Sequence, residues 1–114
     1  MVESNYCPER GDIVWLDFDP HSGQEQKGRR PAIVLSPKIY NAKTGLALFC
    51  PITNQIKGYP FEVLLPLKLP VTGVIISDHI KSLDWQIRNA EFIVKAPNQI
   101  LNETLNKFST LVKV

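Results

Sequence analysis

The sequence predicts a mainly β domain, a small antiparallel barrel or curled sheet that ends in one amphipathic helix. The first observation is a series of five or six short apolar segments, separated by polar loops and bounded by Pro or Gly. The second is a change of period after Pro97, where apolar residues recur on one helical face. Such a helix would cover an edge or an open end of the sheet. The apolar positions of this face are Leu101, Leu105, Phe108 and Val112.

The expected strands follow from alternation and from the turn residues between them. In residues 13–19, Val14, Leu16 and Phe18 occupy every second position, as in a strand with one face in the core. Further strands are expected at residues 31–36, 46–52, 61–65, 71–77 and 86–95, the last one strongest over 91–95. The segments 37–45 and 83–85 are expected to form turns.

Length and composition fit one globular domain over residues 1–114. With 44% apolar and 21% charged residues, the chain is not expected to be disordered. Its net charge of +2 permits nucleic-acid binding without requiring it. Cys7 and Cys50 do not form a disulfide framework or a zinc pattern, which favours a reduced, cytosolic protein. We expect no signal peptide, and no apolar run reaches the roughly 20 residues that span a bilayer.

The loop before residues 31–36 delivers two adjacent arginines to the start of a strand. Residues 23–30 carry glycines, amides and charges, whereas the next five residues are apolar. Pro31 favours extended backbone at Arg30, because its ring clashes with a helical residue before it. Side chains alternate along an extended segment, so Arg29 and Arg30 are expected on opposite faces. One of them can line a site while the other meets solvent or a partner.

The sequence lacks the patterns of several enzyme classes. His21 and His79 have no Cys or His at ligand spacing, so we expect no metal site and no cofactor. Scattered glycines argue against a P-loop or a dinucleotide fingerprint, and no serine stands in a nucleophile elbow. Chemistry is then left to acids, bases and charges on loops at strand ends. Groups expected to converge at one rim are Glu25, Lys27 and Arg30, then Thr53, Gln55, Lys57 and Tyr59, then Asp78, His79 and Lys81.

The loop around Lys57 and Tyr59 has the character of a site for single-stranded nucleic acid. The lysine offers a cation for phosphates, and the tyrosine offers a ring on which a base can stack. Each residue also has a structural interpretation, as a solvated lysine and as a turn tyrosine before Pro60. The combination of loops, rather than either residue alone, favours RNA binding.

The chain contains, in this order, the segments GDIVWLDFDP, SGQEQKGRRPAIVLSP, LFCPIT with KGYPFEV, and TGVIISDHIKSLDW. In combination they resemble the MazF/PemK-type toxins of bacterial toxin–antitoxin modules, and the resemblance covers nearly the whole chain. It implies an SH3-like barrel with a C-terminal helix, and a homodimer. It also implies ribosome-independent cleavage of single-stranded RNA at short sequences, which stops translation and growth, and inhibition by the flexible tail of a cognate antitoxin.

The resemblance also implies catalytic roles for residues of three loops. The family's arginine before the proline falls on Arg30, and its threonine after the third strand falls on Thr53. Its loop glutamate falls on Glu25, in the same Glu-Gln pair, and its strand-five aspartate on Asp78.

The chain departs from some members of this family at two positions. Those members have a histidine just before the loop glutamate and an arginine two residues before the aspartate. This chain has Gln24 and Ile76 there, so Asp78 lacks the arginine that accompanies it in those members.

A ribonuclease that works without metal uses the ribose 2′-hydroxyl as nucleophile and leaves 2′,3′-cyclic phosphate and 5′-hydroxyl ends. Arg30 suits the phosphate, since its planar fork binds two oxygens, and it does not suit the base because guanidinium stays protonated. Thr53 would add a second hydrogen bond to the phosphate. Glu25 is the first candidate for the base, with Asp78 and His79 as rivals. The predicted RNA-binding residues are Lys27, Arg29, Asn41, Gln55, Lys57, Tyr59, His79 and Lys81.

Two other functions remain open at this point. A toxin of the same barrel type binds and poisons a topoisomerase, and a generic SH3-like adaptor is the third class. The loop of residues 53–60 and Arg30 favour the nuclease, because a topoisomerase poison needs neither. A basic groove is expected to accept an acidic, disordered antitoxin tail that competes with RNA for Arg30 and Lys57. Operator DNA would be bound only through the antitoxin, and the protein would act in the cytoplasm.

Overall fold

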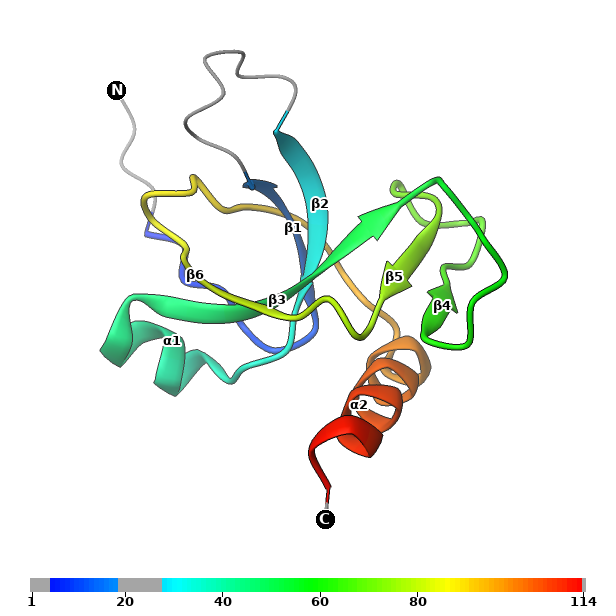
Figure 1. Ribbon diagram of the computed structural model, residues 1–114. Coiled ribbons are helices and arrows are strands. Elements are labelled where there is room, and N and C mark those ends of the chain that lie inside the picture. The colour runs from blue at the N-terminus through cyan, green and yellow to red at the C-terminus, as the bar shows by residue number, and fades with distance from the viewer. Residues whose placement is uncertain (1–4, 19–27, 114) are drawn as a thin grey trace.

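The computed structural model describes residues 5–18 and 28–113, which form one seven-stranded sheet and two helices (Figure 1). The strands lie in the order β4-β5-β3-β2-β1-β7, with β6 paired to β3, and each pair is antiparallel. The elements are β1 (Asp12–Asp17), β2 (Arg29–Val34), α1 (Lys38–Thr44), β3 (Leu46–Thr53), β4 (Glu62–Leu64), β5 (Val74–Ile76), β6 (Lys81–Asp84), β7 (Glu91–Lys95) and α2 (Asn98–Val112).

The sheet bends along β3, which pairs with three other strands. Residues from Leu46 to Phe49 pair with β6, and the end of β3 at Ile52 and Thr53 pairs with β5. The opposite edge of β3 pairs with β2. In Figure 1, β3 therefore runs from α1 on one side of the molecule to β4 and β5 on the other. The sheet curls as expected for a small barrel, but its strand order does not close on itself.

Alternate side chains of the central strands fill two apolar clusters, as the period of a strand requires. Ile13 and Ile33 belong to one cluster, whereas their neighbours Val14 and Val34 belong to the other. This alternation confirms the strand predicted from residues 13–19, which is β1. The predicted C-terminal helix is also confirmed: α2 starts directly after Pro97 and packs on the first cluster through Ile100, Leu101 and Leu105.

The prediction of turns over residues 37–45 was wrong, because Lys38–Thr44 form the helix α1. Asn41 anchors this helix from inside, since its side chain is fully buried and hydrogen-bonded to Ser36 and to the carbonyl of Pro8. Gly45 ends the helix with a left-handed φ of 75°. Among the described residues, neither helix is long and apolar enough to cross a membrane.

The turn predicted at residues 83–85 begins two residues later. Lys81–Asp84 form β6, which pairs with β3, and the turn follows at residues 85–89. Leu83 and Trp85 pack against the second cluster, and the indole nitrogen of Trp85 donates to the carbonyl of Asn41 at 2.9 Å. These contacts with distant residues hold β6 and the turn after it in place.

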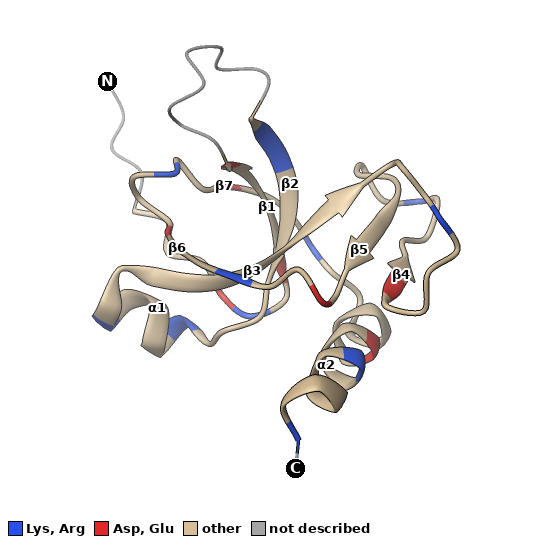
Figure 2. Ribbon diagram, viewed as in Figure 1, with Lys and Arg blue, Asp and Glu red and all other residues tan. Residues whose placement is uncertain are grey.

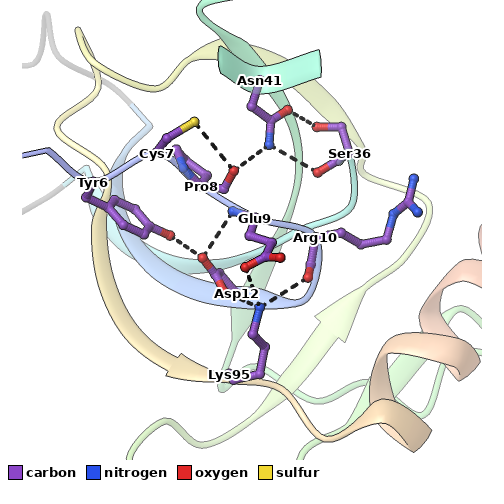
Figure 3. A network of polar contacts seen from close by, with 9 residues as sticks. All are labelled: Tyr6, Cys7, Pro8, Glu9, Arg10, Asp12, Ser36, Asn41 and Lys95. Carbon is purple, nitrogen blue, oxygen red and sulfur yellow. Dashed lines mark hydrogen bonds and ion pairs between the residues drawn. The ribbon is translucent and has the colours of Figure 1, made fainter. Parts of the chain in front are cut away.

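A buried carboxylate ties the N-terminal segment to the sheet (Figure 3). Asp12, at the start of β1, is 4% exposed and accepts hydrogen bonds from the Tyr6 hydroxyl at 2.6 Å and the Glu9 amide at 3.1 Å. Its other oxygen lies 2.7 Å from the ammonium of Lys95 in β7. Burial, together with the bond to Asp12, raises the pKa of Tyr6. The network holds the N-terminal segment before β1 against β1 and β7.

Candidate nucleic-acid interface

A groove of about 390 Å³ lies where β2 begins, where β3 and β5 end, and where the chain between β3 and β4 passes over them. We call it the Arg30 groove. It brings together residues that are distant in sequence, as predicted for a rim of strand ends. The lining residues are Arg30, Pro51, Thr53, Gln55, Lys57, Tyr59, Glu62, Ile76 and His79.

Arg30 is the exposed cation at the start of β2, and it has no ion-pair partner within residues 5–18 and 28–113. Figure 2 shows basic positions both here and on the chain beyond the end of β3. Because no carboxylate neutralises it in this part of the molecule, the guanidinium can bind an anion that enters the groove.

Arg29 serves a different surface. Its guanidinium lies 2.8 Å from Asp17 and 2.9 Å from Glu91, and its side chain is 27% exposed. It lines a second groove, of about 610 Å³, whose wall includes Tyr6 and Trp85. The hydrogen bonds from Asn89 and Arg29 outweigh partial burial and keep the pKa of Asp17 below its usual value. The expectation that the two arginines face different sides is therefore confirmed.

Thr53 ends β3 with its hydroxyl oxygen accepting a hydrogen bond from the amide of Gln55 at 3.1 Å. Its hydroxyl hydrogen has no acceptor among the described residues and can be donated to a ligand in the groove. Gly73, with φ at +114°, allows the chain before β5 to approach, because a Cβ there would overlap the carbonyl group of Thr53. This close approach places the end of β3 against β5, and so fixes the floor of the groove.

The loop of residues 57–59 is organised by a carboxylate that sequence reasoning missed. Glu62 accepts hydrogen bonds from the amides of Lys57 at 2.9 Å, Gly58 at 3.1 Å and Tyr59 at 3.3 Å. The amide of Lys57, first among these donors, lowers the pKa of the Glu62 carboxyl. A Lys-Gly-Tyr turn followed within three residues by Glu is the signal in the sequence, since a carboxylate there can accept from the amides of the turn.

Asp78 lies behind Tyr59 rather than on the wall of the groove. The Tyr59 hydroxyl donates to one oxygen of Asp78, and this bond raises the pKa of the phenol. The other oxygen is buried and has no hydrogen-bond partner among the described residues. Burial, with the nearby charge of Asp78, raises the pKa of the Cys50 thiol to about 12. The carboxylate is thus next to the groove but covered by the tyrosine.

Of the other predicted site residues, His79 lines the groove, Lys81 does not, and two are not described by the structure. His79 is exposed and lines the groove, whereas Lys81 is exposed at the start of β6 and is not among the lining residues. Ile76, at the position where some family members have arginine, contributes an apolar wall. Glu25 and Lys27, like Gln24, lie outside the described residues.

Asn41 requires a correction. Its side chain is fully buried, and both its amide nitrogen and its oxygen are used in hydrogen bonds within the protein. A side chain in this environment cannot reach RNA, so its role is to hold α1 and the N-terminal segment together. In the described part of the chain, no group of three His, Cys, Asp or Glu residues is placed to hold a metal ion.

Comparisons with known proteins agree on one family. A family model described as PemK-like, MazF-like toxin of type II toxin–antitoxin system matches residues 9–112. The chain is 53% identical over 87 residues to the endoribonuclease toxin MazF of Escherichia coli K12, covering 76% of this chain and 78% of that protein.

Solved structures give the same result. The crystal structure of MazF from Deinococcus radiodurans is 51% identical, with a TM-score of 0.88 over 96% of this chain and 100% of that one. A chain of a MazE–MazF crystal structure from the same organism is 47% identical, with a TM-score of 0.86 over 96% and 99% of the two chains.

Proposed function

Because this chain belongs to the PemK-like, MazF-like toxins of type II toxin–antitoxin systems, we propose that it is an endoribonuclease that cleaves single-stranded RNA in the Arg30 groove. The observation that carries the proposal is that Arg30, which has no ion pair among the described residues, meets Thr53, Lys57 and Tyr59 in one groove. This set offers a phosphate clamp, a hydroxyl donor and a stacking ring. In the same proposal, the protein is the toxin of its toxin–antitoxin module, and residues 1–114 form a single domain.

The reaction proposed is attack of a ribose 2′-hydroxyl on the adjacent phosphate, which releases a 5′-hydroxyl and leaves a 2′,3′-cyclic phosphate. Arg30 binds the phosphate oxygens and stabilises the negative charge that develops on them, and the Thr53 hydroxyl donates a further hydrogen bond. Both residues are positioned by strand backbone, Arg30 in β2 and Thr53 at the end of β3. A site on strands holds its groups with little freedom to move.

Three residues are candidates for the general base. Glu25 remains the first candidate, on the resemblance of its Glu-Gln pair to the family. His79 is exposed and lines the groove, and histidine is the side chain that most often acts as a general base. Asp78 is covered by the Tyr59 hydroxyl, so its use as a base requires that Tyr59 move aside first.

RNA binding is proposed along the chain between β3 and β4. Lys57 meets a phosphate, Tyr59 stacks on a base, and Gln55 is exposed and able to bond a base edge. Lys27, His79 and Lys81 extend this surface in the proposal, whereas Arg29 would contact RNA at the second groove. Arg29 would act there only in addition to its ion pairs with Asp17 and Glu91.

An antitoxin protein is the expected partner, since solved relatives include a MazE–MazF complex from Deinococcus radiodurans. We propose that an acidic segment of the cognate antitoxin competes with RNA for Arg30 and Lys57. Operator DNA would be bound through the antitoxin alone, and the protein would act in the cytoplasm. The alternative of a topoisomerase poison has no support, because the relatives that the chain matches are named as endoribonucleases.

The homodimer is proposed on a third surface, the α2 groove, of about 370 Å³ between α1 and α2. Tyr40 of α1 and Leu105 and Phe108 of α2 line it, and Leu111 at the end of α2 is 53% exposed. A two-fold dimer would place the same apolar patch of both copies in contact.

Incubation of the purified protein with a pool of single-stranded RNA, followed by sequencing of the cut ends, tests the proposal. We expect cuts at a short common sequence, and no cuts with the Arg30→Ala variant. Intact RNA at micromolar enzyme, with a protein that folds correctly, would exclude the endoribonuclease activity. In that case, relaxation of supercoiled DNA by a topoisomerase, measured with and without the protein, would test whether the protein inhibits that enzyme.

A further inference from the structure

We infer that Glu62 is a positioning residue for RNA binding, which holds Lys57 and Tyr59 at the Arg30 groove through their backbone amides. The inference rests on the proposed function, since it concerns the same groove. It assigns no chemical step to the Glu62 carboxylate, which already accepts three hydrogen bonds from the protein.

The loop of residues 57–59 turns around the Glu62 carboxylate. One oxygen accepts from the amide of Lys57, and the other accepts from the amides of Gly58 and Tyr59. Gly58 adopts a left-handed φ of 77°, which allows successive amides to point inward at one anion. Among the described residues, these three amides donate to no other acceptor, so the Glu62 side chain alone satisfies them there.

Glu62 is itself held from behind by β4 and α2. It is the first residue of β4 and lies opposite Ile76 of β5. Its carbonyl accepts a hydrogen bond from the ammonium of Lys107 at 2.9 Å, and Lys107 also lies 3.4 Å from Glu103. The carboxylate therefore projects from a backbone that is fixed by a strand pair and by the C-terminal helix.

On the other side, the loop closes onto the groove. The Tyr59 hydroxyl donates to Asp78, and the Tyr59 ring packs at 6.0 Å from the ring of Phe61. Lys57 and Tyr59 both line the groove that Arg30 enters. The contacts thus run from Lys107 of α2 through Glu62 and the loop of residues 57–59 to Tyr59, which lines the Arg30 groove.

Loss of the carboxylate should affect RNA binding more than the chemical step. Without Glu62, RNA must order the loop when it binds, which raises KM, whereas Arg30 and Thr53 keep their strand positions. We expect KM to rise about tenfold, the ratio that corresponds to the net loss of one charge-assisted hydrogen bond. We expect kcat to change by less than about threefold, because no group on the reacting phosphate is lost.

The test compares Glu62→Gln and Glu62→Asp with Glu9→Gln as a matched control. Glu9 is also exposed, and its carboxylate pairs with Lys95 at 3.5 Å, outside the Arg30 groove. Three quantities are measured: KM and kcat on a single-stranded RNA, hydrogen exchange of individual amides by NMR, and Tm. We expect the two Glu62 variants to raise KM and to speed exchange at residues 57, 58 and 59, with exchange in β1 to β3 unchanged.

A combined variant separates positioning from general destabilisation. If Glu62 acts through Lys57 and Tyr59, then Glu62→Gln should add little to KM in a background that carries both Lys57→Ala and Tyr59→Ala. An unchanged KM in Glu62→Gln, or faster exchange throughout the sheet with a lower Tm, would overturn the inference. Wild-type protein that cleaves no RNA would refute the proposed function instead, and the amide exchange would still decide whether Glu62 holds the loop.

Discussion

Arg29 and Arg30 are consecutive residues of β2, yet one is neutralised by two carboxylates and the other faces the groove without an ion pair in the described structure. Pro31 follows them and keeps the backbone extended, so the alternation of a strand separates the two side chains. The division is a consequence of the sequence Arg-Arg-Pro at the start of a strand. It gives the two arginines different roles.

Arg30→Ala should reduce the rate of RNA cleavage by about 10²–10³-fold or more, because the positive charge that binds the phosphate is lost. Arg30→Lys should restore little of it, since an ammonium lacks the planar fork. Arg29→Ala should affect cleavage much less and instead lower Tm, because Asp17 and Glu91 lose their partner. Initial rates and circular dichroism of the three variants check this. Equal losses of activity for Arg29→Ala and Arg30→Ala, with unchanged folds, would contradict the assignment.

Lys57→Ala should weaken RNA binding and make it less sensitive to salt. Each phosphate contact of a single strand contributes about 0.7 to the slope of log affinity against log salt, so one contact should be missing from that slope. Binding of a non-cleavable RNA analogue over a range of salt concentrations gives the measurement. The exposed Lys43 of α1, outside the groove, provides the matched control in Lys43→Ala. A slope identical to that of the wild type would exclude a phosphate contact for Lys57.

Asn41→Ala should destabilise the fold by about 1–3 kcal/mol without changing KM for RNA, because buried hydrogen-bond partners lose the amide. Urea unfolding and steady-state kinetics measure the two effects separately. If Asn41 bound RNA, Asn41→Ala would instead raise KM and leave the free energy of unfolding unchanged. Such a result would contradict the structural role that its burial assigns to Asn41.

The Asp12 network should make the protein sensitive to alkaline pH. Burial and Asp12 raise the pKa of Tyr6, and for Lys95 the bond to Asp12 outweighs burial and raises its pKa as well. Both groups hold their protons more tightly in the folded chain, so the stability that they contribute is complete below their ordinary pKa values, about 10 to 10.5. It is lost as the pH rises above that range.

Urea unfolding at about pH 8 and about pH 11 measures this loss, and the Tyr6→Phe variant should show a smaller decrease between the two values. Tyr40→Phe serves as the control, since Tyr40 is a tyrosine outside the network. An equal decrease in Tyr6→Phe and in the wild type would show that the phenol of Tyr6 does not contribute.

Phe108→Lys should convert the proposed dimer into a monomer, because it places a charge in the apolar α2 groove. Sedimentation at micromolar concentration compares it with Asn102→Lys, which changes an exposed position of the same helix. A wild-type protein that sediments as a monomer, or a Phe108→Lys variant that remains dimeric, would exclude this surface as the dimer interface.

The parts of the fold that follow from local patterns were predictable from the sequence. β1 has a two-residue period, β2 has Pro31 as its third residue, and α2 has a regular apolar face. α1 has only seven residues, too few for a clear period, and depends on the buried bonds of Asn41. β6 depends on its pairing with β3, which its own residues do not reveal.

The candidate site divides in the same way. The sequence placed Arg30, Thr53 and Lys57 at strand ends or in loops, and the fold brings all three to one groove. It gave no indication that Tyr59 covers Asp78, because that contact joins residues 19 positions apart. The apolar pattern of residues 61–65 places Glu62 in a strand and indicates nothing more. Its carboxylate meets the amides of residues 57–59 only in the folded chain, where the loop turns back toward β4.

Cleavage of a single-stranded RNA that carries one deoxyribose, placed directly 5′ to the mapped cut, tests the 2′-hydroxyl mechanism most directly. The all-ribose strand, in excess EDTA, should be cut to a 2′,3′-cyclic phosphate and a 5′-hydroxyl. The substituted strand should remain intact at that position under the same conditions, because its nucleophile is missing. Cutting of the substituted strand at the same bond would contradict attack by the ribose in the Arg30 groove.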